Sequence, residues 1–206
     1  MTKEGIYFSL PFIILGIALF LLFRKSISIT LLYGSIASFY LGLLFALFFR
    51  DPERKVPNGD KLILAPADGR IIRLENDDGH IGLSIFLSIH NVHVNRAPVA
   101  GVIKSVEFKP GRFHAAFRKA AMTENQRNEI EIETGAGIVK MNQISGCIAR
   151  RAICYKKPGE RIRAGDRIGL IRFGSRVDLS LPNGCTIDVI PKQRVKAGET
   201  ILGQLQ

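Results

Sequence analysis

The stretch Gly169-Leu-Ile-Arg-Phe-Gly-Ser-Arg-Val-Asp-Leu-Ser-Leu-Pro182 contains two apolar runs separated by a short interruption. Aliphatic and β-branched residues predominate on either side of Phe173-Gly174-Ser175-Arg176, which is typical of strands buried on at least one face. A Gly-Ser pair between two such runs is ordinarily a turn. The stretch therefore predicts a strand–turn–strand unit in a β-rich domain.

The same alternation of short runs and turns extends from residue 61 to the C-terminus. Asp-Gly, Pro-Gly, Ala-Gly and Asn-Gly pairs separate the runs. Only Phe113–Thr123 predicts a helix, so we expect a mainly β (α+β) domain, a flattened barrel or sandwich. The expected strands are Lys61–Ala65, Ile71–Leu74, Ile81–Ile89, Gly101–Phe108, Asn128–Thr134, Ile138–Gln143, Arg167–Phe173, Arg176–Leu181 and Thr186–Ile190.

Two pairs of segments in this domain are similar to each other. Ala65-Pro-Ala-Asp-Gly-Arg-Ile71 is paired with Ala97-Pro-Val-Ala-Gly-Val-Ile103, and Ile162-Arg-Ala-Gly-Asp-Arg-Ile168 with Val195-Lys-Ala-Gly-Glu-Thr-Ile201. Such turn-then-strand repeats resemble lipoyl-type hammerhead domains, in which similar turns join the strands of a flattened barrel. The resemblance concerns fold and not chemistry.

The first fifty residues have a different composition. Ile6–Phe23 is an apolar run of 18 residues and Ile29–Phe49 one of 21, and neither contains a charge. As helices they would be roughly 27 and 31 Å long, close to the hydrocarbon thickness of a bilayer. We expect residues 1–50 to form a membrane-anchoring hairpin, with Gly34, Ser38 and Gly42 on its packing face. A re-entrant or interfacial hairpin is the alternative, and a signal peptide fits poorly because no small-residue cleavage site follows.

The distribution of charged residues indicates on which side of the membrane the domain of residues 51–206 lies. Four of the 29 Lys+Arg and one of the 18 Asp+Glu lie in residues 1–50, so residues 51–206 carry a net +8. The bias of basic residues at the two ends of the hairpin favours a cytoplasmic domain at the cell membrane. The basic residues are scattered without aromatic stacking motifs, so nucleic-acid binding is not expected. The three cysteines lack ligand-like spacing, which predicts neither a metal site nor a disulfide framework.

A Gly-Ser pair also permits a reaction. Glycine has no Cβ and tolerates strained dihedral angles, so the serine hydroxyl meets little obstruction in attacking the preceding carbonyl. The attack converts an amide to an ester, and elimination with loss of ammonia then leaves a ketone at the new N-terminus. Such a ketone captures an amine and draws electrons from a departing carboxylate, as pyridoxal phosphate does.

Several motifs together resemble one family, the short phosphatidylserine and archaetidylserine decarboxylases. Their order is that of the family from about residue 48 to 206, and a set of ordered motifs is more specific than any single one. Long members usually read Leu-Gly-Ser-Thr where this chain has Phe-Gly-Ser-Arg, which places it with the short forms. The motifs are Phe48-Phe-Arg-Asp-Pro-Glu-Arg54, Ala65-Pro-Ala-Asp-Gly69, Asn91-Val-His-Val-Asn-Arg-Ala-Pro98, Asn125-Gln-Arg-Asn128, Gln143-Ile-Ser-Gly-Cys-Ile-Ala-Arg-Arg151 and Phe173-Gly-Ser-Arg-Val-Asp178.

The resemblance implies a self-cleaving domain over residues 51–206. The bond between Gly174 and Ser175 would break, giving a large fragment (β chain, 1–174) and a small one (α chain, 175–206) that stay together because their strands share one core. Ser175 would become a covalent pyruvoyl group, the cofactor, which forms a Schiff base with the amine of phosphatidylserine or an archaeal ether-lipid analogue. The sequence leaves open which of these lipids is the substrate and whether the protein is a homodimer.

The resemblance also implies roles for individual residues. His93 would be the general base for Ser175, and Asp68 would orient that histidine. His90 would serve decarboxylation, although strand alternation puts it on the opposite face from His93 unless a bulge intervenes. Asn95 shares the strand face of His93.

Arg96 would bind the substrate phosphate or carboxylate, since its planar fork suits either anion. A surface salt bridge is the other reading of this arginine. For the whole protein the alternative is a membrane-anchored lipoyl-like adaptor or carrier, but no lysine stands at the hairpin tip to carry lipoate. The enzyme predicts two fragments on a denaturing gel, and the adaptor predicts one intact chain.

Overall fold

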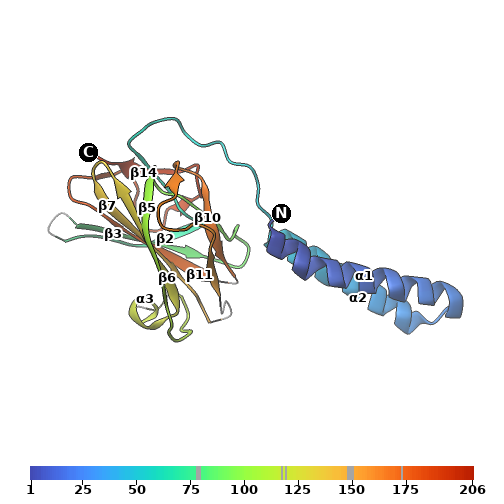
Figure 1. Ribbon diagram of the computed structural model, residues 1–206. Helices are drawn as coiled ribbons and strands as arrows, with labels where there is room; N and C mark the ends of the chain where they lie inside the picture. Colours follow the sequence, from blue (N-terminus) through green and yellow to red (C-terminus); the bar gives the residue numbers. More distant parts are fainter. Residues whose placement is uncertain (78–79, 117, 119, 148–150, 173) are drawn as a thin grey trace. The chain divides into compact units, whose positions relative to one another are not determined.

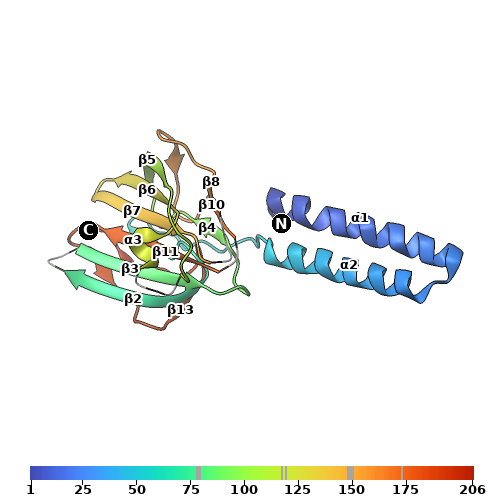
Figure 2. The ribbon, with the colours of Figure 1, turned by 90° about the horizontal axis from the view of Figure 1, so that it is seen from below.

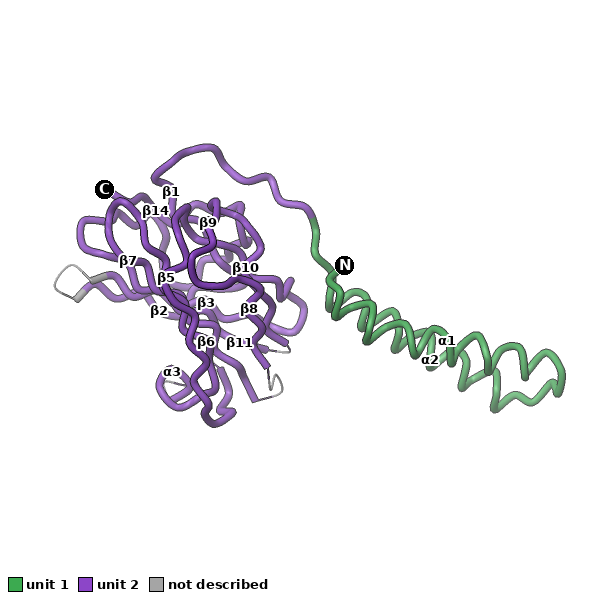
Figure 3. Tube along the Cα trace, in the orientation of Figure 1, with its two compact units in different colours: residues 1–52 green, residues 53–206 purple. Residues whose placement is uncertain are grey.

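The computed structural model describes residues 1–206 except 78–79, 117, 119, 148–150 and 173. The chain forms two compact units, Met1–Pro52 and Glu53–Gln206 (Figure 3). The first contains the apolar segment and the second the β-rich segment. Each unit is described separately below.

The first unit is a helical hairpin of α1 (Lys3–Ser26) and α2 (Ile29–Phe48). Both helices are long and apolar enough to cross a bilayer, which suits membrane association. Small residues line the contact, where Ser35 Oγ donates to the carbonyl of Gly16 at 2.9 Å and Ser38 Oγ to that of Phe12 at 2.7 Å. Ser38 and Gly42 lie on this face as expected, and Ser35 is buried there where the sequence pattern indicated Gly34.

The second unit is built around a curled antiparallel sheet of eight strands (Figures 1 and 2). Its strand order is β13-β2-β3-β11-β7-β6-β5-β9, and two three-stranded sheets, β1-β14-β12 and β4-β10-β8, complete the unit. The mainly β (α+β) domain expected from the sequence is confirmed, and its large sheet is curled into a half-barrel. The strands are β1 (Leu62–Leu64), β2 (Gly69–Asp77), β3 (His80–Leu87), β4 (Val94–Arg96), β5 (Gly101–Lys109), β6 (Arg127–Thr134), β7 (Gly137–Ile144), β8 (Ala152–Cys154), β9 (Arg161–Ile162), β10 (Arg167–Ile171), β11 (Ser175–Leu181), β12 (Thr186–Ile187), β13 (Arg194–Val195) and β14 (Ile201–Gln204).

The two internal repeats occupy equivalent places in the fold. Gly198 N–H donates to the carbonyl of Ala65 at 2.8 Å, and Gly165 N–H donates to that of Ala97 at 2.9 Å. Both glycines have positive φ, +72° and +85°, a conformation that side chains disfavour. In each case a turn of the second pair of segments contacts the segment that leads into a strand. The strand before that turn also pairs with this strand: β13 with β2 in one case, and β9 with β5 in the other.

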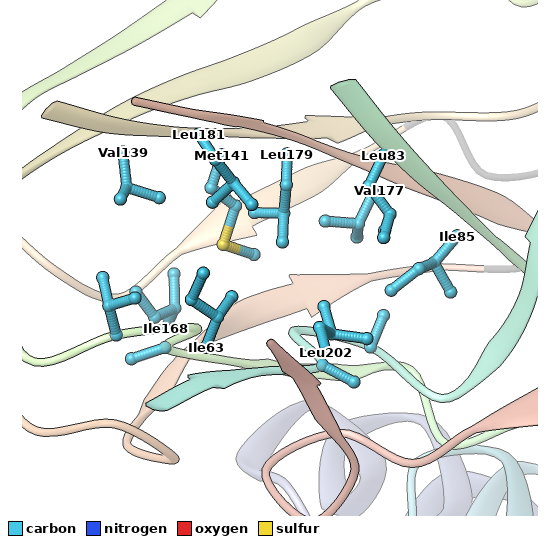
Figure 4. Packing of buried hydrophobic residues seen from close by; sticks show 14 of the residues in the cluster. Ile63, Leu83, Ile85, Val139, Met141, Ile168, Val177, Leu179, Leu181 and Leu202 are labelled. Carbon is cyan, nitrogen blue, oxygen red and sulfur yellow. The ribbon is translucent and has the colours of Figure 1, made fainter. Parts of the chain in front are cut away.

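The apolar core lies on the inner face of the curled sheet (Figure 4). Along β11, Val177, Leu179 and Leu181 are buried and Ser180 is exposed, so the strand keeps the two-residue period of a half-buried strand. Each such buried side chain contributes about 1.5–3 kcal/mol. Residues on both sides of the Gly174–Ser175 bond share this core, as expected.

The expected helix over Phe113–Thr123 is wrong in the described part of that segment. Only α3 (Ala121–Glu124) is helical. The Asn125 side chain accepts from the backbone N–H of His114 and donates to its carbonyl, both at 2.8 Å. These two bonds take the backbone groups of His114 that a helix would use, because a side-chain amide competes for them.

Candidate active site

The inner face of the curled sheet changes from apolar to polar at one end. The change falls at the same level on two neighbouring strands, where Asn128 on β6 is paired with Gln143 on β7. On β11 the partner of Gln143 is still the apolar Val177, and the change comes two residues earlier, at Ser175. Asn128 Nδ2 donates to Gln143 Oε1 at 3.0 Å, and Gln143 Nε2 donates to Asn95 Oδ1 at 2.9 Å. A buried polar group is costly unless hydrogen-bonded, so this chain of amides marks a specialised part of the core.

Ser175 lies at this polar end. It is the first residue of β11, paired with Leu87 of β3, and two residues before Val177 on the same inner face. Its side chain is fully buried, and Ser175 Oγ has no hydrogen-bond partner among the residues that the structure describes. The oxygen lone pairs of this hydroxyl are therefore available for attack on a neighbouring carbonyl.

Gly174 brings the backbone into position immediately before the serine. Its φ is +63°, in the left-handed region that glycine enters without steric cost. The preceding residue of the predicted motif, Phe173, lies outside the described residues. A left-handed glycine at the end of the β11 ladder bends the chain, so the turn expected at the Gly-Ser pair falls on the half-buried Gly174, and the buried Ser175 already belongs to the strand.

His93 contacts this turn through its imidazole ring. The ring is fully buried; Nδ1 lies 2.9 Å from the carbonyl oxygen of Asn91, and the N–H of Gly174 donates to Nε2 at 3.4 Å. A carbonyl oxygen only accepts, so the proton resides on Nδ1 and Nε2 keeps its lone pair. Nε2 is thus turned toward the Gly174–Ser175 segment, one residue from the serine for which a general base is expected.

The carbonyl oxygen of Gly174 packs against Gly146. A Cβ atom built on Gly146 would lie 2.0 Å from this oxygen, far inside van der Waals contact. Gly146 follows the end of β7, beside the start of β11. The carbonyl group that Ser175 would attack therefore lies against position 146, where only a glycine leaves room for it.

Gly146→Ala should impair cleavage at the Gly174–Ser175 bond. The added methyl forces the carbonyl away from its seat, and a misplacement of about 1 Å costs roughly 100-fold in rate. The measurement is the time course of fragment appearance on a denaturing gel after translation in vitro. Gly82→Ala is the matched control, since a Cβ at this strand glycine meets nothing within 4 Å. Cleavage of Gly146→Ala at the normal rate would show that the close contact between Gly146 and the Gly174 carbonyl is not needed.

Asn95 belongs to the polar end of the core. It is fully buried, and its Nδ2 has no hydrogen-bond partner among the described residues, whereas Oδ1 accepts from Gln143. The ladder between β4 and β10 continues to His93, whose carbonyl accepts from Ile171 N–H at 3.2 Å. His93 and Asn95 therefore share a strand face, as expected, and the structure brings both toward the same end of the core.

Asp68 has different contacts from those its expected role suggested. Both carboxylate oxygens accept from Arg54 Nη2 at 3.0 Å, and Oδ1 accepts from Ala197 N–H at 2.8 Å. The carboxylate is largely buried. Orientation of His93 by Asp68 is not among these hydrogen bonds and stays a prediction.

His90 and Arg96 differ from His93 and Asn95 in their places in the fold. His90 is exposed in a turn after β3, so it is not on a strand that also contains His93. Arg96 is buried on the opposite face of β4 from Asn95, and its Nη1 donates to the carbonyl of Gly165 at 3.0 Å. Their expected roles toward the substrate stay predictions.

Arg176 anchors the strand that begins at Ser175. Its side chain is buried, pairs with Asp178 and donates to Ser84 Oγ at 2.6 Å on the neighbouring β3. Charge-assisted hydrogen bonds of this kind are stronger than neutral ones. The bond to Ser84 ties residue 176 to the large fragment, so a cut at Gly174–Ser175 would leave the new N-terminus in place.

The free cysteines lie outside this group of residues. Burial raises the pKa of the Cys154 and Cys185 thiols, which lowers their reactivity at neutral pH. Cys147, next to Gly146, is exposed.

Comparison with known proteins identifies the group to which this site belongs. The family model for phosphatidylserine decarboxylase matches residues 41–203. A phosphatidylserine decarboxylase proenzyme of Pelodictyon phaeoclathratiforme is 46% identical, covering 80% of this chain and 81% of that protein. The proenzyme of the same name from Desulfotalea psychrophila is 41% identical over 100% of this chain and 96% of its own length.

Proposed function

We propose, from the premise that this chain belongs to the phosphatidylserine decarboxylase family, that it makes its own prosthetic group from Ser175. The chain is a decarboxylase, a carboxy-lyase, and relatives that match most of its length are named as proenzymes. A carrier protein without catalytic activity does not account for that similarity. The substrate we assign is phosphatidylserine, because the relatives are named for it.

The observation that carries the proposal is the position of His93 Nε2. Its lone pair accepts from the N–H of Gly174, one residue from a buried hydroxyl that has no partner among the described residues. The polar chain ending at Asn95 supplies an unpaired donor in the same end of the core. These residues fit a group generated in place from Ser175, since base, nucleophile and a left-handed glycine occur together.

Cleavage would proceed in two stages. Ser175 Oγ attacks the carbonyl carbon of Gly174 as its proton passes to His93 Nε2; the C–N bond breaks, and the proton moves to the released nitrogen. Removal of the α-proton of residue 175 then expels Gly174 as a carboxylate and leaves a C=C bond. Addition of one water and release of one ammonia convert residue 175 to a pyruvoyl group, with residues 1–174 and 175–206 as two fragments.

When formed, the pyruvoyl group would supply a ketone that captures the substrate amine and accepts the electrons released with CO2. The chain's own residues would hold the lipid and manage protons. We assign protonation in this second reaction to His90, and contacts with the polar headgroup to Asn95 and Arg96. The membrane hairpin would keep the enzyme at its substrate, with the second unit on the cytoplasmic side.

Reductive trapping tests this proposal. Borohydride added to the protein with phosphatidylserine should attach the lipid to fragment 175–206 and stop release of labelled CO2. A parallel reaction with an ether-lipid analogue shows whether the enzyme distinguishes ester-linked from ether-linked chains on the glycerol. Attachment of the lipid to a lysine elsewhere, with residue 175 unmodified, would rule out the proposed prosthetic group.

The proposed role of Asp68 in processing has its own test. The second repeat has Ala100 where the first has Asp68, so the turn itself does not need a carboxylate. If Asp68 acts through His93, Asp68→Asn should slow cleavage at least about ten-fold, whereas Arg54→Gln should not. Equal slowing in both variants would indicate instead that the Arg54–Asp68–Ala197 contact is what matters. Fragment time courses distinguish the two.

A further inference from the structure

A pocket with two arginines in its lining lies on the outer face of the curled sheet. It has a volume of about 300 Å³ and is lined by Gly69, Arg70, Phe86, Ser88, Asn91 and Arg194. Phe86 and Ser88 flank Leu87, the strand partner of Ser175. Because neighbouring strand residues point to opposite faces, the pocket and the Ser175 side chain lie on different sides of the sheet.

Two of the residues that line this pocket are arginines that lie opposite each other on neighbouring strands. Arg70 on β2 and Arg194 on β13 are directly opposite in the antiparallel ladder. Their β-strand neighbours Gly69 and Val195 are buried, so both guanidinium groups project outward, where both residues are exposed. No acidic side chain pairs with either within the described part of the chain. Like charges directly opposite each other destabilise a strand pair, and a bound anion would remove that cost.

The remaining polar group of the pocket is also a donor. Asn91 Oδ1 accepts from both the backbone N–H of Ser88 at 2.9 Å and Ser88 Oγ at 2.7 Å. The backbone N–H must donate, which fixes Oδ1 toward it and leaves Nδ2 with its hydrogens. Two guanidinium forks and an amide N–H₂ around one pocket match the oxygens of a phosphate.

We infer that Arg70, Arg194 and Asn91 form a binding site for the phosphate of an anionic phospholipid headgroup, separate from the reaction site at Ser175. A lipid source is favoured over free phosphate because the chain carries two helices of membrane-spanning length. The pocket is close in sequence to the residues proposed for cleavage. Asn91, which lines it, is two residues from His93, and its carbonyl accepts from His93 Nδ1. This second site goes beyond the proposed function and needs neither cleavage nor decarboxylation.

The test is calorimetric titration of the full-length protein in neutral detergent with dihexanoyl phosphatidic acid, which has no amine or carboxylate to react. Arg70→Gln with Arg194→Gln should weaken binding roughly ten-fold or more. The matched control is Arg161→Gln with Arg163→Gln, which removes two exposed charges in and next to β9, at the opposite edge of the sheet. This control should bind as the unaltered chain does.

The other outcomes are equally decisive. Unchanged binding by Arg70→Gln/Arg194→Gln, or equal weakening in the control, would overturn the site. Inorganic phosphate that binds as tightly as the lipid would overturn the lipid source. Thermal unfolding of the unliganded double variant shows that it folds, and removal of the like-charge pair should leave its melting temperature equal or higher. Because binding is read without activity, failure of the pyruvoyl proposal would leave this result intact.

Discussion

Ser175→Ala should remain a single chain of 206 residues and lose decarboxylase activity. Alanine has no hydroxyl to attack Gly174, so neither the cut nor the ketone can form. Enzymes accelerate their reactions by about a million-fold or more, and if the ketone is the electron acceptor, its loss should remove roughly six orders of magnitude or more. A denaturing gel and release of labelled CO2 from phosphatidylserine measure the two effects.

The control for this prediction lies on the same strand. Ser180 is exposed on β11, so Ser180→Ala should be cleaved and active. The Ser175→Ala chain should also fold, because it removes only a hydroxyl without a partner among the described residues. Cleavage of Ser175→Ala at the same bond would exclude attack by the serine.

His93→Ala should slow the cleavage roughly 100- to 10,000-fold. The imidazole Nε2 accepts from the N–H of Gly174, next to the bond that should break, and a positioned general base contributes rate factors of about this size. The measurement is the rate of fragment appearance after translation in vitro. Added imidazole should restore part of the rate, which a purely structural defect in a buried position would not allow.

His90→Ala separates the two histidines. His90 is exposed in a turn, so its loss should leave cleavage at the normal rate while lowering decarboxylation if it acts on the substrate. Cleavage of His93→Ala at the unaltered rate would exclude His93 as the general base for Ser175. Slow cleavage of His90→Ala would show that the roles are reversed or shared.

Much of the fold follows from local sequence. Apolar and β-branched runs predicted β11 and its neighbour β7, and the Ala-Gly pairs of the repeats predicted turns that the structure contains, at Gly165 and Gly198. Sequence reasoning missed strands such as β8, β9, β13 and β14, which have two to four residues each. Segments this short have no periodicity of their own, and their pairing depends on partners far away in the chain.

The candidate site was predictable only in part. A Gly-Ser pair and a histidine in a strand-like run pointed to Ser175 and His93, but Gly146 and Gln143 received no role. Their motifs were visible, yet their importance comes from register: Gln143 meets Asn95, and Gly146 meets the carbonyl of Gly174. Contacts between residues so far apart in sequence arise from the tertiary fold, which local patterns do not specify.

The intact mass of the freshly folded, unaltered protein tests the central claim most directly. We predict two species, one of residues 1–174 and one of residues 175–206, the smaller lighter by one ammonia than its sequence with a free serine. Its N-terminus should resist Edman degradation and react with hydrazine. A single species with the mass of all 206 residues, in protein that releases CO2 from phosphatidylserine, would contradict the account.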